Sequence, residues 1–241
     1  MDRMIYLSMS GAKATMQRQD TLANNLANVS TVGFRAELAA FRAVPVQGSG
    51  ASTRVFALES TTGYDGSTGN VSATGRPLDV AMKGNSWLAV QGLDGTEAYT
   101  RAGSLDVAAD GTLTTRNGLM VLGDGGPIQL PPNSEVLIGN DGTVSAKGVD
   151  GKSAAVGKLK LVTPEQPLQR GTDGLFRAED GELPADPTAR VQDGALEGSN
   201  VSAVETMVAM ITAARQFESQ MKMLQTAEAD EKAAAQLLSM S

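Results

Sequence analysis

Two Ser-x-x-Lys patterns are the part of this sequence that comes nearest to catalytic chemistry. They lie at Ser10/Lys13 and Ser219/Lys222, and a lysine next to a serine can activate the hydroxyl for acyl transfer. The companion SDN and KTG motifs of the Ser/Lys acyl-transfer enzymes are absent from the chain. We therefore interpret both patterns as polar residues of helices. A Ser/Lys hydrolase stays the enzymatic alternative, and covalent labelling by a serine-reactive probe would reveal it.

A phosphate site and a calcium site are also suggested by short patterns. Asp150-Gly151-Lys152-Ser153 ends like a phosphate-binding loop, but Ala146 stands where that motif needs its first glycine. The many aspartates form neither an EF-hand loop nor a nonapeptide repeat. The sequence predicts turns at these places, with no cofactor and no metal.

Composition excludes further classes of protein. The chain has no cysteine and no histidine, so thiolates, disulfides and the commonest general base and metal ligand are missing. Its formal net charge is −7 over 241 residues, which disfavours a nucleic acid partner. It shows neither a cleavable secretory signal nor an apolar run of the ~20 residues that span a membrane. We expect a protein that is not an enzyme and does not cross a membrane.

Glycine and proline are confined to the middle of the chain. Of 27 glycines, only Gly11 precedes Gly33 and none follows Gly198, and all nine prolines lie between Pro45 and Pro187. Both residues interrupt helices. The pattern predicts an α+β protein with helical ends and a turn-rich, β-rich interior.

The two ends carry apolar residues at steps of three or four, which is typical of helices that pack on one another. A capping box, Ser202 to Glu205, begins the second of them. We expect residues 1–33 and 199–241 to form long helices paired as a coiled coil, which also packs against other chains. The alternative is that two ordinary amphipathic helices cover one globular core.

The interior divides into two parts. Residues 34–77 are small and polar and predict an extended connector. Residues 78–198 predict an antiparallel all-β domain of short strands, because Asp-Gly recurs nine times along the chain between apolar runs. We expect these pairs to form type I′ hairpin turns. The runs expected to be strands are 87–90, 105–107, 136–138 and 159–162.

Three stretches resemble the bacterial flagellar rod and hook proteins, the axial family. The first is Leu22-Ala23-Asn24-Asn25-Leu26-Ala27-Asn28-Val29-Ser30-Thr31-Val32-Gly33-Phe34-Arg35; the others are Tyr99-Thr100-Arg101-Ala102-Gly103-Ser104-Leu105 and Gly194-Ala195-Leu196-Glu197-Gly198-Ser199-Asn200-Val201. They occur in the family's order and spacing. Within the family, the first six residues, residues 85–91 and residues 216–224 look most like proximal-rod members.

The resemblance implies a structural subunit of the proximal rod of the flagellar basal body, the drive shaft that transmits torque across the periplasm. It implies export by the flagellar type III apparatus without a cleaved signal, and assembly with copies of itself and other rod proteins. A distal-rod or hook subunit is the nearest alternative. A secreted β domain that binds cell wall or carbohydrate is the alternative from another class.

Assembly through the helical ends implies a set of interface residues. The Asn24, Asn25 and Asn28 amides would cap helix ends or bond between subunits. The expected interface residues are Ile5, Met9, Met16, Leu22, Asn24, Asn25, Leu26, Asn28, Val204, Met207, Ile211, Phe217, Met221 and Leu224.

Overall fold

The computed structural model describes residues 2–45, 55–132, 134–148 and 152–239. They form two compact units. The first contains Met1–Val29, Ala36–Asp65 and Val201–Ser241, and the second contains Ser30–Arg35 and Gly66–Asn200. No helix among the described residues is both long and apolar enough to cross a membrane.

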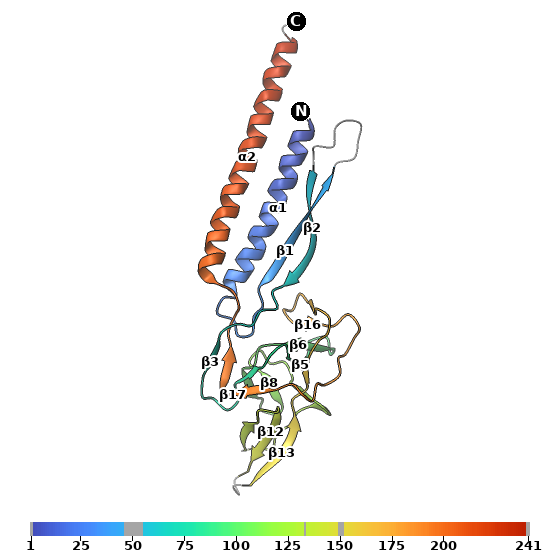
Figure 1. The fold of residues 1–241 in the computed structure, drawn as a ribbon, viewed down its shortest axis with the longest axis vertical. Helices are drawn as coiled ribbons and strands as arrows, with labels where there is room; N and C mark the ends of the chain where they lie inside the picture. The colour runs from blue at the N-terminus through green and yellow to red at the C-terminus, as the bar shows by residue number, and fades with distance from the viewer. Residues whose placement is uncertain (1, 46–54, 133, 149–151, 240–241) are drawn as a thin grey trace. The chain divides into compact units, whose positions relative to one another are not determined.

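The first unit consists of two helices and a β-hairpin (Figure 1). Helix α1 spans Asp2–Ala27 and helix α2 spans Ala203–Ser239. Strands β1 (Glu37–Pro45) and β2 (Val55–Tyr64) pair antiparallel, and α1 lies beside both α2 and this hairpin. The predicted start of α2 is confirmed, since the Glu205 N–H donates to Ser202 Oγ at 3.4 Å.

The predicted coiled coil is wrong, although the α+β class holds. Large side chains of the expected seam point outward: Met9 is 55% exposed and Ile211 is also 55% exposed. Among the described side chains of the two helices, the buried ones are small or polar, namely Ser8, Ala12, Asn25, Thr206, Ala213 and Ala227. A coiled coil needs large apolar knobs on the facing seams. Here small side chains line the inner faces, and α1 shares its contacts between α2 and the hairpin.

The segment 34–77, expected to be an extended connector, contains this hairpin and one short further strand. Register in the hairpin runs from Glu37 opposite Tyr64 to Pro45 opposite Val55, with one irregularity between Ala40 and Phe41. The limits of the three domains expected from the sequence stay a prediction.

The second unit is built from short strands whose pairings are antiparallel. A five-stranded sheet has the order β14-β5-β6-β16-β15, a three-stranded sheet the order β11-β12-β13, and the remaining strands pair in twos. The strands are β3 (Val71–Ala73), β4 (Val80–Met82), β5 (Trp87–Gln91), β6 (Glu97–Thr100), β7 (Leu105–Val107), β8 (Leu113–Thr115), β9 (Leu122–Gly123), β10 (Gly126–Pro127), β11 (Glu135–Ile138), β12 (Thr143–Lys147), β13 (Ser153–Lys158), β14 (Leu161–Val162), β15 (Gln169–Arg170), β16 (Phe176–Arg177), β17 (Val191–Asp193) and β18 (Ala195–Glu197).

The core of this unit is made mainly of aliphatic side chains, which in β4 and β5 are buried at successive positions. In β11 and β12 the buried positions alternate with more exposed ones, as expected of sheets with one face covered. Its central members are Val80, Leu88, Val90, Leu105, Leu113, Val121, Val144, Leu159, Leu161 and Val191.

Four of the Asp-Gly pairs mark turns of another type than the predicted type I′, whereas Asp65-Gly66 lies outside any turn. In Gly92-Leu93-Asp94-Gly95-Thr96, the Gly95 N–H donates to Gly92 O at 3.0 Å and the Gly92 N–H donates to Thr96 O at 2.8 Å. The glycine is thus the fourth residue of a β-turn and has φ 80°, which is the three-residue loop with a glycine bulge. The same hydrogen bonds recur at 108–112, 139–143 and 171–175. Asp150 and Gly151 lie outside the described residues.

Candidate assembly surface and buried ion cluster

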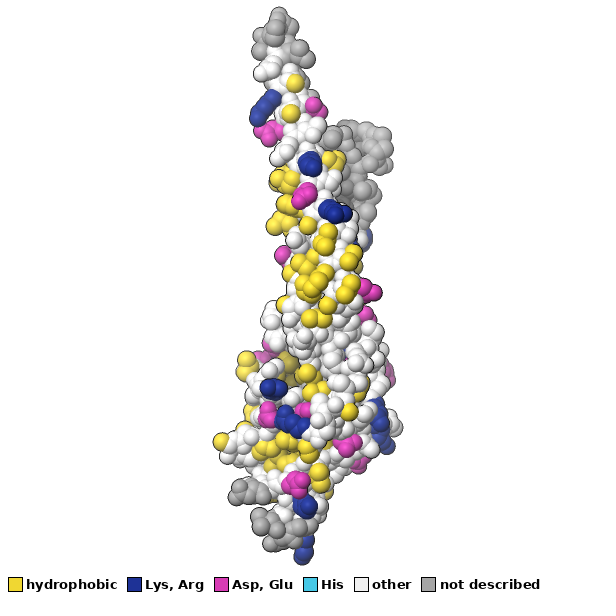
Figure 2. Space-filling view, turned by 90° about the vertical axis from the view of Figure 1, so that its left-hand side faces the viewer, with side chains coloured by type: hydrophobic (Ala, Val, Ile, Leu, Met, Phe, Trp, Pro, Cys, Tyr) yellow, Lys and Arg dark blue, Asp and Glu magenta, His cyan; other side chains and the backbone are white. Residues whose placement is uncertain are grey.

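An exposed apolar surface covers the helices of the first unit. We call it the helical apolar surface; its members are Tyr6, Met9, Met16, Val204, Met207, Val208, Ile211, Met221 and Met223, each more than a third exposed. Figure 2 shows hydrophobic side chains gathered along the helical part of the chain. Large apolar side chains that gather on the exposed side of helices are typical of a protein–protein interface.

Most of the predicted interface residues with large side chains belong to this surface. Of the others, Leu22, Leu26, Phe217 and Leu224 are half-buried within the unit. The side chain of Ile5 lies outside the described residues. The structure therefore places one part of the predicted set on the exposed surface and leaves the other part half-buried.

The three predicted asparagines have different surroundings. Asn25 is buried, and its amide pairs with the backbone of Glu37. Asn28 Nδ2 donates to Asn24 O and to Asn24 Oδ1, each at 2.9 Å, at the end of α1. Both sets of hydrogen bonds are formed inside the subunit, so they stabilise the end of the helix and its connection to β1.

A buried ion cluster in the second unit was not predicted as a site. Glu197, which ends β18, is fully buried and accepts from two arginines. Arg35 Nη2 lies 2.7 Å from Glu197 Oε1, and Arg101 Nη2 and Nε lie 2.5 Å and 2.9 Å from Glu197 Oε2. The Cζ atoms of Arg35 and Arg101 lie over the ring of Trp87, at 6.0 Å and 5.9 Å from its centroid, and Trp87 is 1% exposed.

The guanidinium groups of the two arginines differ in how many of their N–H groups are hydrogen-bonded. Arg101 also donates to the carbonyl oxygens of Gly84, Ser86 and Met82, at 2.8, 2.6 and 3.0 Å. Arg35 Nε and Nη1 are buried without a hydrogen-bond partner among the described residues. Burial lowers the pKa of Arg101, and Glu197 opposes that shift. One carboxylate thus serves two buried cations.

A signal for this cluster was present in the sequence. Arg35, Arg101 and Glu197 each belong to a different one of the three stretches that carry the family resemblance. The sequence did not predict that these three residues are in contact, because hydrophobic periodicity gives information only about residues close together in the chain.

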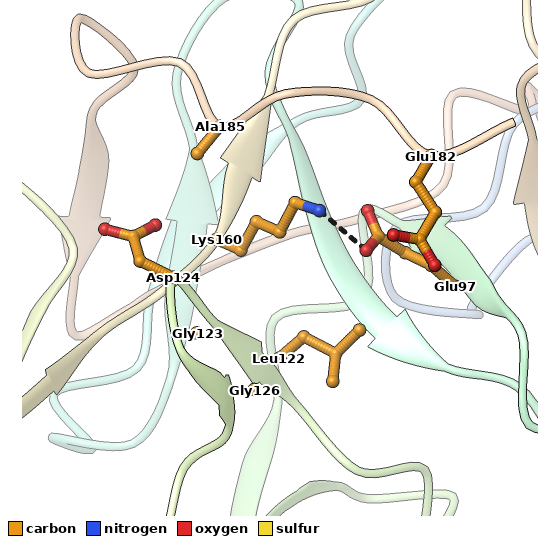
Figure 3. Close-up of a pocket in the computed structure, with 8 residues that line it drawn as sticks. All are labelled: Glu97, Leu122, Gly123, Asp124, Gly126, Lys160, Glu182 and Ala185. Carbon is orange, nitrogen blue, oxygen red and sulfur yellow. Dashed lines mark hydrogen bonds and ion pairs between the residues drawn. The ribbon is translucent and has the colours of Figure 1, made fainter.

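A shallow cavity of about 400 Å³ lies elsewhere in the second unit, and Figure 3 shows the side chains around it. Lys160 Nζ donates to Glu97 Oε2 at 2.6 Å, and the Tyr99 hydroxyl donates to Glu97 Oε1 at 2.9 Å and accepts from the Leu183 N–H at 2.7 Å. Burial raises the pKa of Tyr99 above its ordinary value. These bonds hold the loop at Leu183 on strand β6, and the carboxylates of Asp124 and Glu182 are exposed.

The Ser-x-x-Lys patterns lie on the helices of the first unit and do not line this cavity. Ser10 and Lys13 lie on α1, Ser219 and Lys222 lie on α2, and both lysines are exposed. In the described part of the chain, no three Asp or Glu side chains gather as a metal site would require.

Comparisons with known proteins agree with the motif order. Three family models match: "Flagella basal body rod protein" at residues 5–35, "Flagellar hook protein FlgE/F/G D1 domain" at 81–146, and "Flagellar basal body rod FlgEFG protein C-terminal" at 192–237.

Full-length relatives give the same result. The flagellar basal-body rod proteins FlgF of Salmonella typhimurium and of Escherichia coli are each 48% identical to this chain, over 100% of both sequences. The basal-body rod protein FlgG of Bacillus subtilis is 34% identical over 94% of this chain and 95% of its own. The chain belongs to the flagellar basal-body rod protein family.

Proposed function

We propose that this chain is a structural subunit of the proximal rod of the flagellar basal body, and that it binds neighbouring subunits through the helical apolar surface. The observation that carries the proposal is the exposure of large side chains such as Met207 and Ile211, at 50% and 55%, within a family of rod proteins. Burying apolar area contributes about 25 cal/mol per Å², so covering this surface favours assembly.

The partners follow from the same reasoning. Copies of this chain and other rod proteins are the neighbours in a rod, and head-to-tail contacts that do not close generate an open helical array. The rod lies in the periplasm, so we further propose delivery by the flagellar type III export apparatus. Such a subunit works as a part of a shaft rather than as an enzyme.

The relatives with the higher identity support the proximal rod over the distal rod. Identity is 48% to FlgF and 34% to FlgG. Complementation separates these alternatives: the chain should restore motility to a strain that lacks FlgF and fail in a strain that lacks FlgG. The reverse result would assign it to the distal rod.

The assembly surface is tested by placing the same charge at two positions of α2. Ile211→Asp puts a carboxylate on the helical apolar surface, whereas Gln216→Asp puts one at an exposed polar position. We expect Ile211→Asp to be absent from isolated basal bodies and Gln216→Asp to be incorporated. Circular dichroism of both monomers controls for helix loss, and normal motility with Ile211→Asp would reject the surface.

A further inference from the structure

All the sulfur in this chain belongs to methionine. The sequence has 11 methionines and no cysteine, so the thioether is its readily oxidised group. Five methionines of the helical apolar surface are more than a third exposed, namely Met9, Met16, Met207, Met221 and Met223. We call them the surface methionines. Because oxidation follows exposure, an oxidant in solution reaches them directly in the free subunit.

The other methionines differ from these in place and exposure. Met82 of β4 is 3% exposed, Met120 is an exposed residue of the second unit, and Met210 is half-buried on α2. The side chains that lie outside the described residues are those of Met1, Met4 and Met240. Met82 and Met120 therefore provide a buried and an exposed reference away from the helices.

The surface methionines recur along each helix at a helical spacing. Met9 and Met16 are seven residues apart on α1, and Met207 and Met221 are fourteen apart on α2. Seven residues make nearly two turns, so residues at this spacing share a face of their helix. Each helix thus exposes thioethers repeatedly along one face.

Oxidation changes the polarity of this surface and leaves the chain intact. Hydrogen peroxide transfers one oxygen atom to the thioether sulfur; its O–O bond breaks as the S–O bond forms, and it leaves as water. The sulfur loses two electrons and the peroxide gains them. The sulfoxide is polar, so burying it against an apolar neighbour leaves a polar group without a hydrogen bond, which is unfavourable.

We propose that the surface methionines are the oxidation site of the free subunit, and that their conversion to sulfoxides prevents its assembly. The second half rests on the proposed function, since it requires neighbours to cover the helical apolar surface. Assembly is then selective for reduced subunits. A subunit already in place has this surface covered, so a peroxide acts on the chains that are not yet assembled.

Peptide mass spectrometry of the purified monomer tests the oxidation site. The native chain is treated with hydrogen peroxide, and the sulfoxide at each methionine is followed in time. We expect the surface methionines and Met120 to be oxidised at least about tenfold faster than Met82, because Met82 is buried. Oxidation of Met82 as fast as that of the surface methionines would overturn the proposal.

Glutamine and leucine at the same five positions test the effect on assembly. Glutamine adds a polar, uncharged oxygen, leucine keeps the side chain apolar and cannot be oxidised, and both have helix propensities close to that of methionine. In a strain that lacks FlgF, we expect the leucine variant to enter basal bodies and the glutamine variant to be absent from them. The glutamine variant carries Met9→Gln, Met16→Gln, Met207→Gln, Met221→Gln and Met223→Gln.

The matched control is Met120→Gln, which makes the same change at an exposed methionine of the second unit. We expect this variant to be incorporated normally. Normal incorporation of the five-glutamine variant would overturn the proposal. Loss of the five-leucine variant would overturn it as well, because the polarity of the side chain would then not decide assembly.

Competition covers the case in which the glutamine variant does not fold. The native chain and the leucine variant are produced together, with and without hydrogen peroxide, and their ratio in isolated basal bodies is measured. We expect peroxide to raise the share of the leucine variant at least about twofold. Since both chains meet the same oxidant in the same cells, an unchanged ratio would overturn the proposal.

Failure of the proposed function gives a different result. The native chain would then be absent from basal bodies without any oxidant, which would remove the assembly half of the proposal together with the proposed function. The order of oxidation in the purified monomer does not depend on a rod, so it decides the oxidation site in either case.

Discussion

Asn25 and Glu37 are joined by two hydrogen bonds in opposite directions. Asn25 Nδ2 donates to Glu37 O at 2.9 Å, and the Glu37 N–H donates to Asn25 Oδ1 at 2.8 Å. The Asn25 amide thus satisfies the backbone of the first residue of β1, much as a neighbouring strand would. It connects the last turns of α1 to the hairpin of the same unit.

Asn25→Asp should weaken the first unit, because the buried carboxylate can no longer donate to Glu37 O and faces a carbonyl. We expect a loss of about 1–3 kcal/mol in the free energy of unfolding. Arg18→Ala is the control, since Arg18 is an exposed residue of the same helix, with an effect within about 0.5 kcal/mol. Urea unfolding followed by helical circular dichroism measures both, and equal effects would contradict the role of Asn25.

Gly33→Ala and Gly95→Ala compare two glycines in the left-handed region, with φ 69° and 80°. A Cβ on Gly33 would lie 2.2 Å from the Arg101 carbonyl carbon, whereas a Cβ on Gly95 meets open space. We expect Gly95→Ala to cost about 1–2 kcal/mol for the backbone strain. Gly33→Ala should lower the free energy of unfolding by distinctly more, which thermal unfolding of both variants measures. Equal losses for the two variants would show that the backbone around Gly33 shifts to accommodate the added Cβ.

Arg101→Met and Arg35→Met test the unequal bonding within the buried ion cluster. Arg101→Met removes the guanidinium group that donates to three carbonyl oxygens and to Glu197. We therefore expect the free energy of unfolding to fall by about 3–5 kcal/mol. Arg35→Met removes a cation with two unmet donors and leaves Glu197 paired with Arg101. Arg35→Met should lower the free energy of unfolding by no more than about 1 kcal/mol. Denaturant unfolding of both variants measures the two losses, and a larger loss for Arg35→Met than for Arg101→Met would contradict the prediction.

Acid should destabilise the second unit through the aspartates of its turns. Hydrogen bonds lower the pKa of Asp94, Asp110, Asp141 and Asp173, and those from Thr163 and Thr188 lower the pKa of Asp186 to about 2. Since the unfolded carboxyl has a pKa of about 3.9, these bonds stabilise the fold above that pH and are lost as the pH falls toward about 2.

Asp186→Asn gives that expectation a specific measurement. The variant should show a shallower fall of the melting temperature between about pH 4 and pH 2, because one shifted group is missing. Glu179→Gln, at an exposed position of the same unit, is the control and should keep the native slope. If the melting temperature of Asp186→Asn falls with pH as steeply as that of the native protein, the acid sensitivity comes from other groups.

Hydrogen exchange should separate the two ends from the β-rich unit in the free monomer. We expect faster exchange in the helices at 2–20 and 207–239 than in the strands of the second unit, with these helices protected further after assembly into basal bodies. The physical reason is that the helical apolar surface is covered only by neighbours. Strong protection of both ends in the monomer would indicate a self-contained helical unit.

Local signals explain what could be predicted. The confinement of glycine and proline to the interior predicted α1 and α2, and the Asp-Gly pairs predicted four of the turns, because backbone entropy and positive φ act on single residues. The turn type was missed, since the hydrogen bonds that distinguish a glycine bulge from a type I′ turn involve the flanking strands.

The sequence by itself determined the helical ends, the strand-rich interior and, through three motifs, the family. Only the tertiary structure decided which helix face is buried. Hydrophobic residues that repeat with the helical period are found on more than one face of these helices, so the pattern alone allows either the methionine face or the alanine face to be buried. It alone also decided that Arg35, Arg101 and Glu197 meet, since a buried ion pair between residues far apart in the chain leaves no periodic trace in the sequence.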